Sequence, residues 1–226
     1  MMEEKALILL WLCLLAAVAI AGTVKKRQKK KRQREFVERQ KEKGDEGERA
    51  TEALLNQVRG FKRVLRQVYV PREDTGTSEL DLVMIHEKGI FVIENKYYKG
   101  RIYGDEKELY WMQVFKRGEK RPFYNPVKQN QTHIRNLKRF LEDKIPWDIP
   151  YVSVVVFNGS GKLRRALVDP NTAIVVSGKK VKRRLKRYMR RMRRVLTKGQ
   201  IDEISHFLSR RARGSKRVRR QHEKQF

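Results

Sequence analysis

One stretch decides the fold of this chain: Glu79-Leu-Asp-Leu-Val-Met-Ile-His-Glu-Lys-Gly-Ile-Phe-Val-Ile-Glu-Asn-Lys96. It contains two apolar runs, Leu80–Ile85 and Ile90–Ile93, which are rich in β-branched and large apolar residues. A short segment that includes Gly89 joins the two runs. Two such runs around a glycine-containing turn predict a β-hairpin.

Apolar packing does not explain three charged residues of this hairpin: Asp81, Glu94 and Lys96. A two-residue turn at Glu87-Lys88 would pair His86 with Gly89. Counting outward, Asp81 then lies opposite Glu94, with the two Cβ atoms about 5 Å apart. Glu94 and Lys96 project to the same side because strand side chains alternate. A three-residue turn would shift the register by one residue and need a bulge to restore this convergence.

Two carboxylates and an ammonium group at one spot suit metal-dependent phosphate chemistry. Neighbouring carboxylates raise each other's pKa unless a cation lies between them. Mg²⁺ or Mn²⁺ would accept their oxygens, polarise a phosphoryl group and lower the pKa of a bound water. We therefore expect Asp81 and Glu94 to hold the metal, and Lys96 to position the water or stabilise charge on the phosphate. The alternative is an ordinary cross-strand ion pair.

The hairpin resembles the core of the PD-(D/E)-x-K nucleases, and residues 79–100 resemble the nuclease-related domain (NERD) family in particular. Further pieces follow in that family's order: Gly47-Glu48-Arg49 opening a helix, Trp111 in a later strand, and Asn125-Pro126-x-x-Gln129 opening another helix. The resemblance implies an active site of Asp81, Glu94 and Lys96, with Glu48 and Gln129 as supporting polar residues. Leu80 replaces the Pro of the superfamily's name.

The remaining patterns predict an α/β fold with a mixed central sheet flanked by helices, which is the restriction-endonuclease-like core that the resemblance implies. The expected order is α-β-β-β-β-β-α-β-β. Further strands are expected at Phe61–Val70, Ile102–Tyr103, Leu109–Phe115, Tyr151–Phe157 and Ala173–Val176. Helices are expected at Asp45–Val58, from Pro126 with Asn125 as N-cap, over Val181–Leu196 with a cationic back, and around Ile201–Leu208.

Glu48 and His133 each have a simpler explanation than catalysis. Glu48 lies in the first turn of the expected helix Asp45–Val58, where the helix dipole favours a carboxylate. Gln129 and His133 are four residues apart and share one helix face. A lone histidine on a helix is more often a packing or surface residue, so we leave His133 out of the predicted site.

The formal net charge of +29 is concentrated in two flanking segments. Residues 25–45 carry 11 Lys/Arg and 4 Asp/Glu, residues 46–178 carry 23 and 17, and residues 179–226 carry 20 and 3. Such basic segments attract a polyanion without reading its sequence. We expect a nucleic-acid partner, DNA in preference to RNA, and a basic tail without apolar periodicity at Arg210–Phe226.

Ala6–Val24 is a run of 19 uncharged residues, about 28 Å long as a helix, which is enough to cross a bilayer core. A cleaved signal peptide is the alternative, since Ala19-Ile20-Ala21 resembles a cleavage site. The residues before the run are net acidic, however, and the cluster Lys25–Arg32 follows it, which is the reverse of a secretory signal. The positive-inside rule then predicts a single-pass cell-membrane protein with its N-terminus outside and its remaining domains in the cytoplasm.

The predicted organisation is an anchor at residues 1–24, a basic linker near anionic lipid headgroups at 25–44, a nuclease-like domain at 45–178 and a basic helical extension at 179–226. The leading function is a membrane-anchored, divalent-metal-dependent nuclease. One alternative is a catalytically idle membrane-tethered scaffold that binds nucleic acid. Another is a ribosome- or lipid-associated basic protein with a coincidental triad. The intact triad favours the nuclease, because a scaffold has no need to hold two carboxylates beside a nucleic acid.

Overall fold

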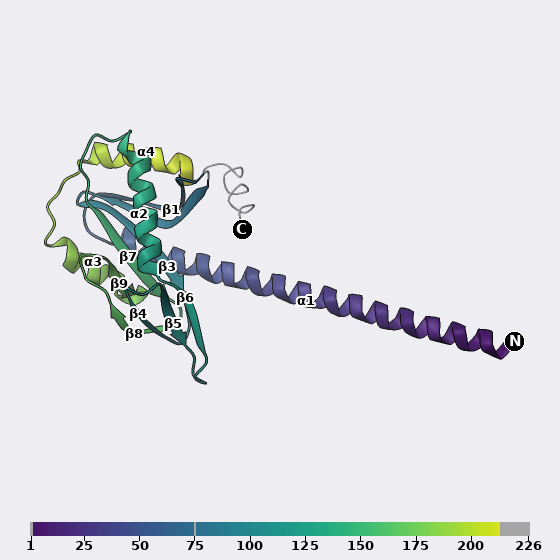
Figure 1. Cartoon of the computed structure of the whole chain (residues 1–226). Helices are drawn as coiled ribbons and strands as arrows, with labels where there is room; N and C mark the ends of the chain where they lie inside the picture. The colour runs from purple at the N-terminus through teal and green to yellow at the C-terminus, as the bar shows by residue number, and fades with distance from the viewer. Residues whose placement is uncertain (1, 75, 213–226) are drawn as a thin grey trace. The chain divides into compact units, whose positions relative to one another are not determined.

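The computed structural model describes the backbone of residues 2–74 and 76–212, and the side chains of residues 22–74 and 76–210. The chain divides into two compact units, residues 1–43 and residues 44–226. A long N-terminal helix forms the first unit and continues into the second, which also holds the sheets and the other helices (Figure 1).

The elements follow one another through the described chain with short connections. In order they are α1 (Met2–Asn56), β1 (Lys62–Pro71), β2 (Thr77–His86), β3 (Gly89–Tyr97), β4 (Arg101–Asp105), β5 (Tyr110–Val114), β6 (Lys120–Tyr124), α2 (Pro126–Glu142), β7 (Tyr151–Asn158), β8 (Lys162–Leu167), β9 (Ile174–Ser177), the 3-10 turn Gly178–Lys180, α3 (Val181–Met189) and α4 (Lys198–Ala212).

Both ends of the chain carry predictions that fall outside the described residues. The expected anchor, Ala6–Val24, lies almost wholly in residues 1–21, whose side chains are not described. The expected basic tail lies outside from residue 213 onward. Within the described part of the chain, no helix has both the length and the apolar character needed to cross a membrane.

The central hairpin forms in the predicted register. β2 and β3 are antiparallel, His86 pairs with Gly89 across a two-residue turn, and the ladder runs to Leu82 opposite Ile93. That last pair lies one step before Asp81 and Glu94. Gly89 has a φ of 134°, and a Cβ there would lie 2.5 Å from the carbonyl oxygen of Pro150, so the turn requires glycine.

A five-stranded sheet in the order β1-β2-β3-β7-β9 holds this hairpin near its centre. β3, β7 and β9 run parallel, whereas β1, β2 and β3 are antiparallel, so the expected mixed α/β core is present. One face packs against α2 and α4, and the other packs against the end of α1 and α3 (Figure 1). Each fully buried Val, Leu or Ile side chain in these layers contributes about 1.5–3 kcal/mol.

A second sheet, in the order β6-β5-β4-β8, corrects the prediction of a single central sheet. β6 and β8 were not predicted from the sequence, because both are mostly exposed, basic strands without apolar alternation. Trp111 lies in β5, as expected for a later strand, and is 1% exposed. Its ring stacks on Phe157 of β7 with centroids 5.9 Å apart, so Trp111 joins the two sheets.

The predicted helix Asp45–Val58 does not begin at Asp45. α1 runs without interruption from Met2 to Asn56, since residues 25–43 contain neither proline nor glycine to stop it. Glu48 therefore lies inside a long helix, and the explanation of this residue by a helix-terminal dipole is wrong.

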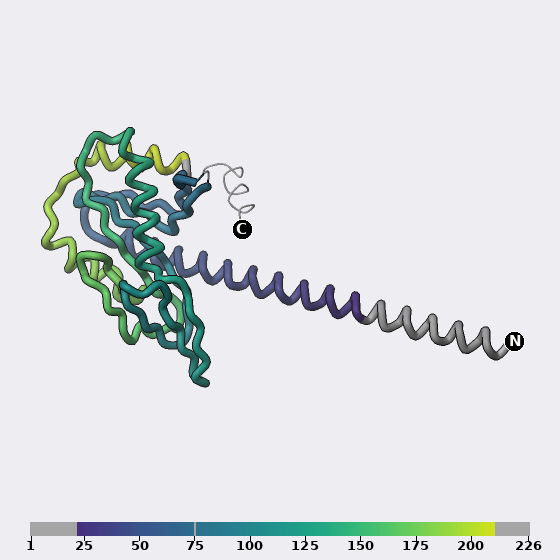
Figure 2. Tube along the Cα trace, viewed as in Figure 1, coloured from purple at the N-terminus to yellow at the C-terminus, as the bar shows by residue number. Residues whose placement is uncertain are grey.

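The helix predicted over Val181–Leu196 ends at Met189 instead. The carbonyl oxygen of Glu87 accepts hydrogen bonds from the backbone N–H groups of Val195 and Leu196, at 2.7 and 3.1 Å. These bonds draw the chain away from a helical path and across the β2–β3 turn. Figure 2 shows the resulting extended stretch, in yellow-green, between α3 and α4.

Candidate active site

Lys96 lies between Glu94 and Gln129 at the open end of the β2–β3 hairpin. Its Nζ is 2.6 Å from Glu94 Oε1 and donates a hydrogen bond to Gln129 Oε1 at 2.9 Å. Burial lowers the pKa of Lys96, but the charges of Glu94 and Asp81 together raise it above its ordinary value. Lys96 is therefore a charged ammonium group in a mostly buried position.

Glu94 is held from its other side by His133 of α2. His133 Nε2 is 3.2 Å from Glu94 Oε2, at ion-pair distance but without the alignment of a hydrogen bond. His133 Nδ1 lies 2.7 Å from Ser78 Oγ. Burial raises the pKa of Glu94, but Lys96 and His133 outweigh burial and hold it below its ordinary value. Glu94, which is 2% exposed, is thus a buried carboxylate between two basic side chains.

Asp81 is the second carboxylate, and its pKa shifts in the opposite direction from that of Glu94. Its Oδ2 accepts a hydrogen bond from the backbone N–H of Asn95 at 2.7 Å. Burial and the charge of Glu94 raise the pKa of Asp81 well above its ordinary value, and Glu48 adds to the increase. A divalent cation between the two carboxylates would remove this electrostatic penalty. Carboxylate oxygens are also ligands that Mg²⁺ prefers, so the pair fits such an ion.

Glu48 approaches this acidic pair from α1. Burial raises its pKa to about 7, against the opposing charge of Arg66. Glu48 Oε2 lies 3.5 Å from Nε2 of Gln67, which has a φ of 51°. Gln67 interrupts the β1–β2 ladder at the position opposite Asp81. A non-glycine residue with positive φ is uncommon, and such strain clusters at functional sites.

Asn95 faces away from the carboxylates and anchors α1. Its Oδ1 accepts hydrogen bonds from Thr51 Oγ1 at 3.0 Å and from Asn158 Nδ2 at 2.5 Å. Asn158 Nδ2 also donates to the carbonyl oxygen of Gly47 at 3.0 Å. A Cβ at Gly47 would lie 3.0 Å from Asn95 Nδ2, so a larger residue would push the helix away. This network fixes the backbone next to Glu48.

Asn125 fixes the start of α2 and so directs Gln129 and His133 toward the hairpin. Its Oδ1 accepts a hydrogen bond from the N–H of Val127 at 2.9 Å, which confirms the predicted N-cap. Its Nδ2 donates to three carbonyl oxygens of the β4–β5 connection, those of residues 105, 106 and 108. The fully buried Asn125 thus ties α2 to the second sheet.

A cavity of about 560 Å³ opens beside this constellation. Ser78, Gln129 and His133 line its inner side, and Arg72 and Tyr124 line another part of it. A ligand in this cavity would meet the helix side chains that touch Lys96 and Glu94.

Residues 43–158, about half of the chain, match the family model of the nuclease-related domain. This chain belongs to the NERD family. NERD domains are part of the PD-(D/E)xK-like nuclease superfamily, as the hairpin's resemblance implied.

One relative is an uncharacterised protein of Bacillus anthracis, 34% identical over 128 residues. The match covers 56% of this chain and 58% of that protein, so the chain spans less than two thirds of the relative's length. No solved structure matches.

The NERD domain brings four of the predicted site residues to one place: Asp81, Glu94, Lys96 and Gln129. Glu48 lies within electrostatic reach of Asp81. His133, which the sequence analysis set aside, contacts Glu94, and Ser78 was not foreseen. The sequence did contain one indication that His133 belongs to the site: it lies four residues after Gln129 and therefore on the same helix face. Among the described residues, no cluster of three or more His, Cys, Asp or Glu side chains has the arrangement of a metal site.

Proposed function

We propose that this protein is a divalent-metal-dependent nuclease that hydrolyses nucleic-acid phosphodiester bonds, with DNA preferred over RNA. The observation that supports it most is the meeting of Asp81, Glu94 and Lys96 at the open end of the hairpin, within a NERD domain. The fold alone would not carry a function, because one fold can host many chemistries.

Asp81 and Glu94 would hold the metal, which we propose to be Mg²⁺ or Mn²⁺. Each carboxylate oxygen has two lone pairs, so Glu94 can keep its contacts with Lys96 and His133 and still offer an oxygen to a cation. When bound, such an ion supplies Lewis acidity and a water of lowered pKa.

Lys96 would stabilise negative charge that develops on the phosphate. Its ammonium group is already oriented by Glu94 and Gln129, so little reorganisation is needed when the substrate reacts. Gln129 would set the direction of the ammonium group. Glu48 would tune Asp81 electrostatically, because the negative charge of Glu48 raises the pKa of Asp81.

We further propose that Ala6–Val24 anchors the protein in the cell membrane, with the N-terminus outside and the NERD domain in the cytoplasm. The uncharged run and the basic cluster that follows it support this orientation. The basic segments on either side of the domain would raise the local concentration of nucleic acid and contact anionic lipid headgroups.

The test is to incubate the full-length protein with labelled DNA and RNA, in Mg²⁺, in Mn²⁺ and in EDTA. We expect cleavage with either metal, none in EDTA, and faster cleavage of DNA. Equal binding of nucleic acid under all three conditions, without cleavage in any, would replace the nuclease with the catalytically idle scaffold.

A further inference from the structure

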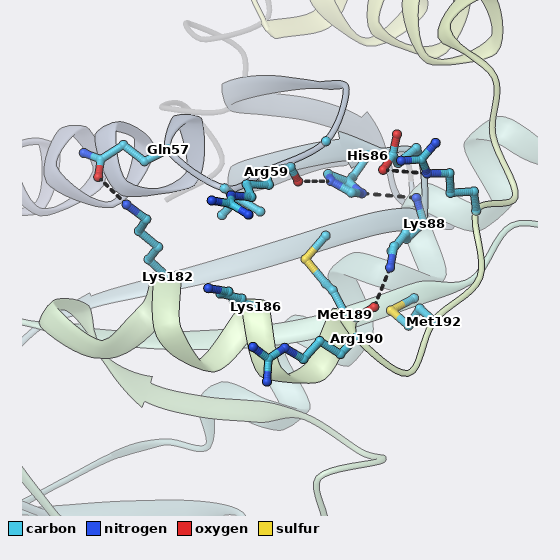
Figure 3. A pocket seen from close by; sticks show the side chains of 13 residues that line it. Gln57, Arg59, His86, Lys88, Lys182, Lys186, Met189, Arg190 and Met192 are labelled. Carbon is cyan, nitrogen blue, oxygen red and sulfur yellow. Dashed lines mark hydrogen bonds and ion pairs between the residues drawn. The ribbon is translucent and has the colours of Figure 1, made fainter.

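A second pocket, of about 500 Å³, lies beneath the turn at the closed end of the same hairpin (Figure 3). The end of α1, the β2–β3 turn and α3 form its walls. Its size falls within the range of small-molecule sites. Six basic residues line it: Arg59, Lys88, Lys182, Lys186, Arg190 and Arg194.

The positive charge of this pocket is mostly uncompensated within the protein. Glu87 is the one acidic residue in the lining, and its Oε1 pairs with Arg194 Nε at 3.1 Å. Lys182 and Lys88 donate only to neutral oxygens, those of Gln57 and of the Met189 backbone. Arg59, Lys186 and Arg190 have no acidic partner among the described residues. Six positive charges against one negative charge leave the lining at +5, and a polyanionic ligand would relieve their mutual repulsion.

The inner wall of the pocket is apolar. Val58, Met189 and Met192 line it, and methionine side chains adapt well to flat or irregular apolar groups. The ring of His86 is part of the same wall, and both of its nitrogens are engaged: Nε2 with the Arg59 carbonyl oxygen at 2.9 Å and Nδ1 with the Lys88 N–H at 3.2 Å. Burial lowers the pKa of His86, and the ring, which is 1% exposed, supports the wall from behind.

The pocket is separate from the candidate active site. Asp81 and His86 are five residues apart on β2, which corresponds to roughly 17 Å along the strand. The active site lies on the face of the sheet covered by α2, whereas the pocket lies on the face covered by α3. One ligand of nucleotide size therefore cannot reach both.

From this geometry we propose that the pocket binds a free nucleotide that carries two or three phosphates. Lys186, Arg190 and Arg59 would contact the phosphates, since among the described residues these are the lining cations without an acidic partner. The base would lie against Met192, the half-buried methionine of the wall, with Met189 behind it. The concave shape favours a compact nucleotide over a nucleic-acid strand, which would lie along the whole exposed side of α3.

The experiment is titration calorimetry of the full-length protein with ATP and ADP, in EDTA so that no metal bridges a nucleotide to Asp81 and Glu94. We expect saturable binding of one nucleotide per chain. The double variant Lys186→Gln, Arg190→Gln should weaken the affinity at least tenfold, because each lost charge-assisted contact costs roughly tenfold.

The matched control is Arg183→Gln, Arg187→Gln. It removes the same charge at the same spacing from exposed positions of α3, of which Arg190 is the C-cap, but neither Arg183 nor Arg187 lines the pocket. We expect less than a twofold change in affinity. Equal losses in the two double variants would instead show non-specific attraction of a polyanion to α3 and overturn the proposal.

Two further arms identify the ligand class. A soluble short-chain anionic phospholipid that binds where ATP and ADP do not would overturn the nucleotide assignment in favour of a lipid headgroup. The variant Glu94→Gln should bind nucleotide as the wild type does. Nucleotide binding in the pocket is therefore tested separately from the proposed nuclease activity.

Discussion

The two ends of the β2–β3 hairpin carry opposite charge, and they differ in whether the protein itself supplies oppositely charged partners. At the open end, the buried carboxylate Glu94 has basic partners from the protein itself, Lys96 at 2.6 Å and His133 at 3.2 Å. At the closed end, five of the six cations that line the pocket have no acidic partner within the described part of the chain. The open end is therefore organised before a ligand arrives, whereas the closed end leaves its charge available to a ligand.

The apolar middle of the hairpin keeps these two ends apart. Leu82 to Ile85 and Ile90 to Ile93 are fully buried, with no charged side chain among them. A stiff, dry strand pair of this kind holds two sites of opposite charge at a constant separation of about 17 Å. The comparison predicts that substitutions at the open end change catalysis and its pH response, and that substitutions at the closed end change ligand binding and salt response.

The largest effect is expected for the carboxylates at the open end. Asp81→Asn and Glu94→Gln should each reduce metal-dependent cleavage by about a thousandfold or more, because a neutral amide is a poor ligand for a hard divalent ion. Single-turnover cleavage and calorimetric metal binding provide the measurement. Glu119→Gln, an exposed carboxylate next to β6, is the control and should keep wild-type activity. Unchanged cleavage in either site variant would remove that residue from the active site.

Lys96→Met should separate catalysis from metal binding. It removes the ammonium group but keeps the apolar stem. We expect turnover to fall about a hundredfold, which is the usual cost of removing one preorganised group that stabilises the transition state. Metal affinity should stay the same or increase, since a cation no longer competes beside Glu94. Lys107→Met, at an exposed position, is the control for loss of one lysine. A parallel loss of metal affinity and turnover would contradict a purely electrostatic role for Lys96.

Glu48→Gln should stabilise the metal-free protein in a pH-dependent manner. Burial raises the pKa of Glu48 from 4.5 to about 7. Below pH 4.5 the residue is protonated in both folded and unfolded chains, so the wild type and the variant should be equally stable. Between pH 4.5 and pH 7 the unfolded chain releases this proton while the folded wild type retains it, so the wild type loses stability until the folded pKa is passed. We expect the variant to gain about 1–3 kcal/mol at pH 8 and nothing at pH 4.

Chemical denaturation at the two pH values measures this difference. Glu46→Gln, an exposed glutamate on the same helix, is the matched control and should show no pH-dependent gain. A gain for Glu48→Gln that is the same at pH 4 and pH 8 would contradict a cost of buried charge.

The smallest effect is expected at the closed end without ligand. Lys186→Gln, Arg190→Gln should raise the free energy of unfolding by about 0.5 kcal/mol at low ionic strength, because two mutually repelling cations are removed. The gain should disappear near 0.5 M salt, where the Debye length is only a few ångströms. Thermal melts at both ionic strengths test this, with Arg183→Gln, Arg187→Gln as the comparison. A gain that survives high salt would point to packing rather than repulsion.

The sequence by itself determined the hairpin and the helix cap at Asn125, and its motifs indicated the family. It left two registers open for the hairpin, of which the structure has the one with the two-residue turn. The hairpin and the cap depend on residues close together in the chain. Alternating faces place Glu94 and Lys96 on one side, a two-residue turn pairs His86 with Gly89, and an Asn-Pro pair starts a helix. Local geometry of this kind can be counted along the chain before any tertiary contact is known.

Only the tertiary structure decided which other residues join the site and how the outer elements end. His133 reaches Glu94 because Asn125 orients α2 against the β4–β5 connection, 17 to 20 residues away in sequence. The α3 helix stops at Met189 because the Glu87 carbonyl, more than 100 residues earlier, binds the N–H groups of residues 195 and 196. The second sheet depends on β8 pairing with β4, about 60 residues apart. These outcomes depend on which distant groups the folded chain brings into contact, and neither periodicity nor propensity in a single sequence contains that information.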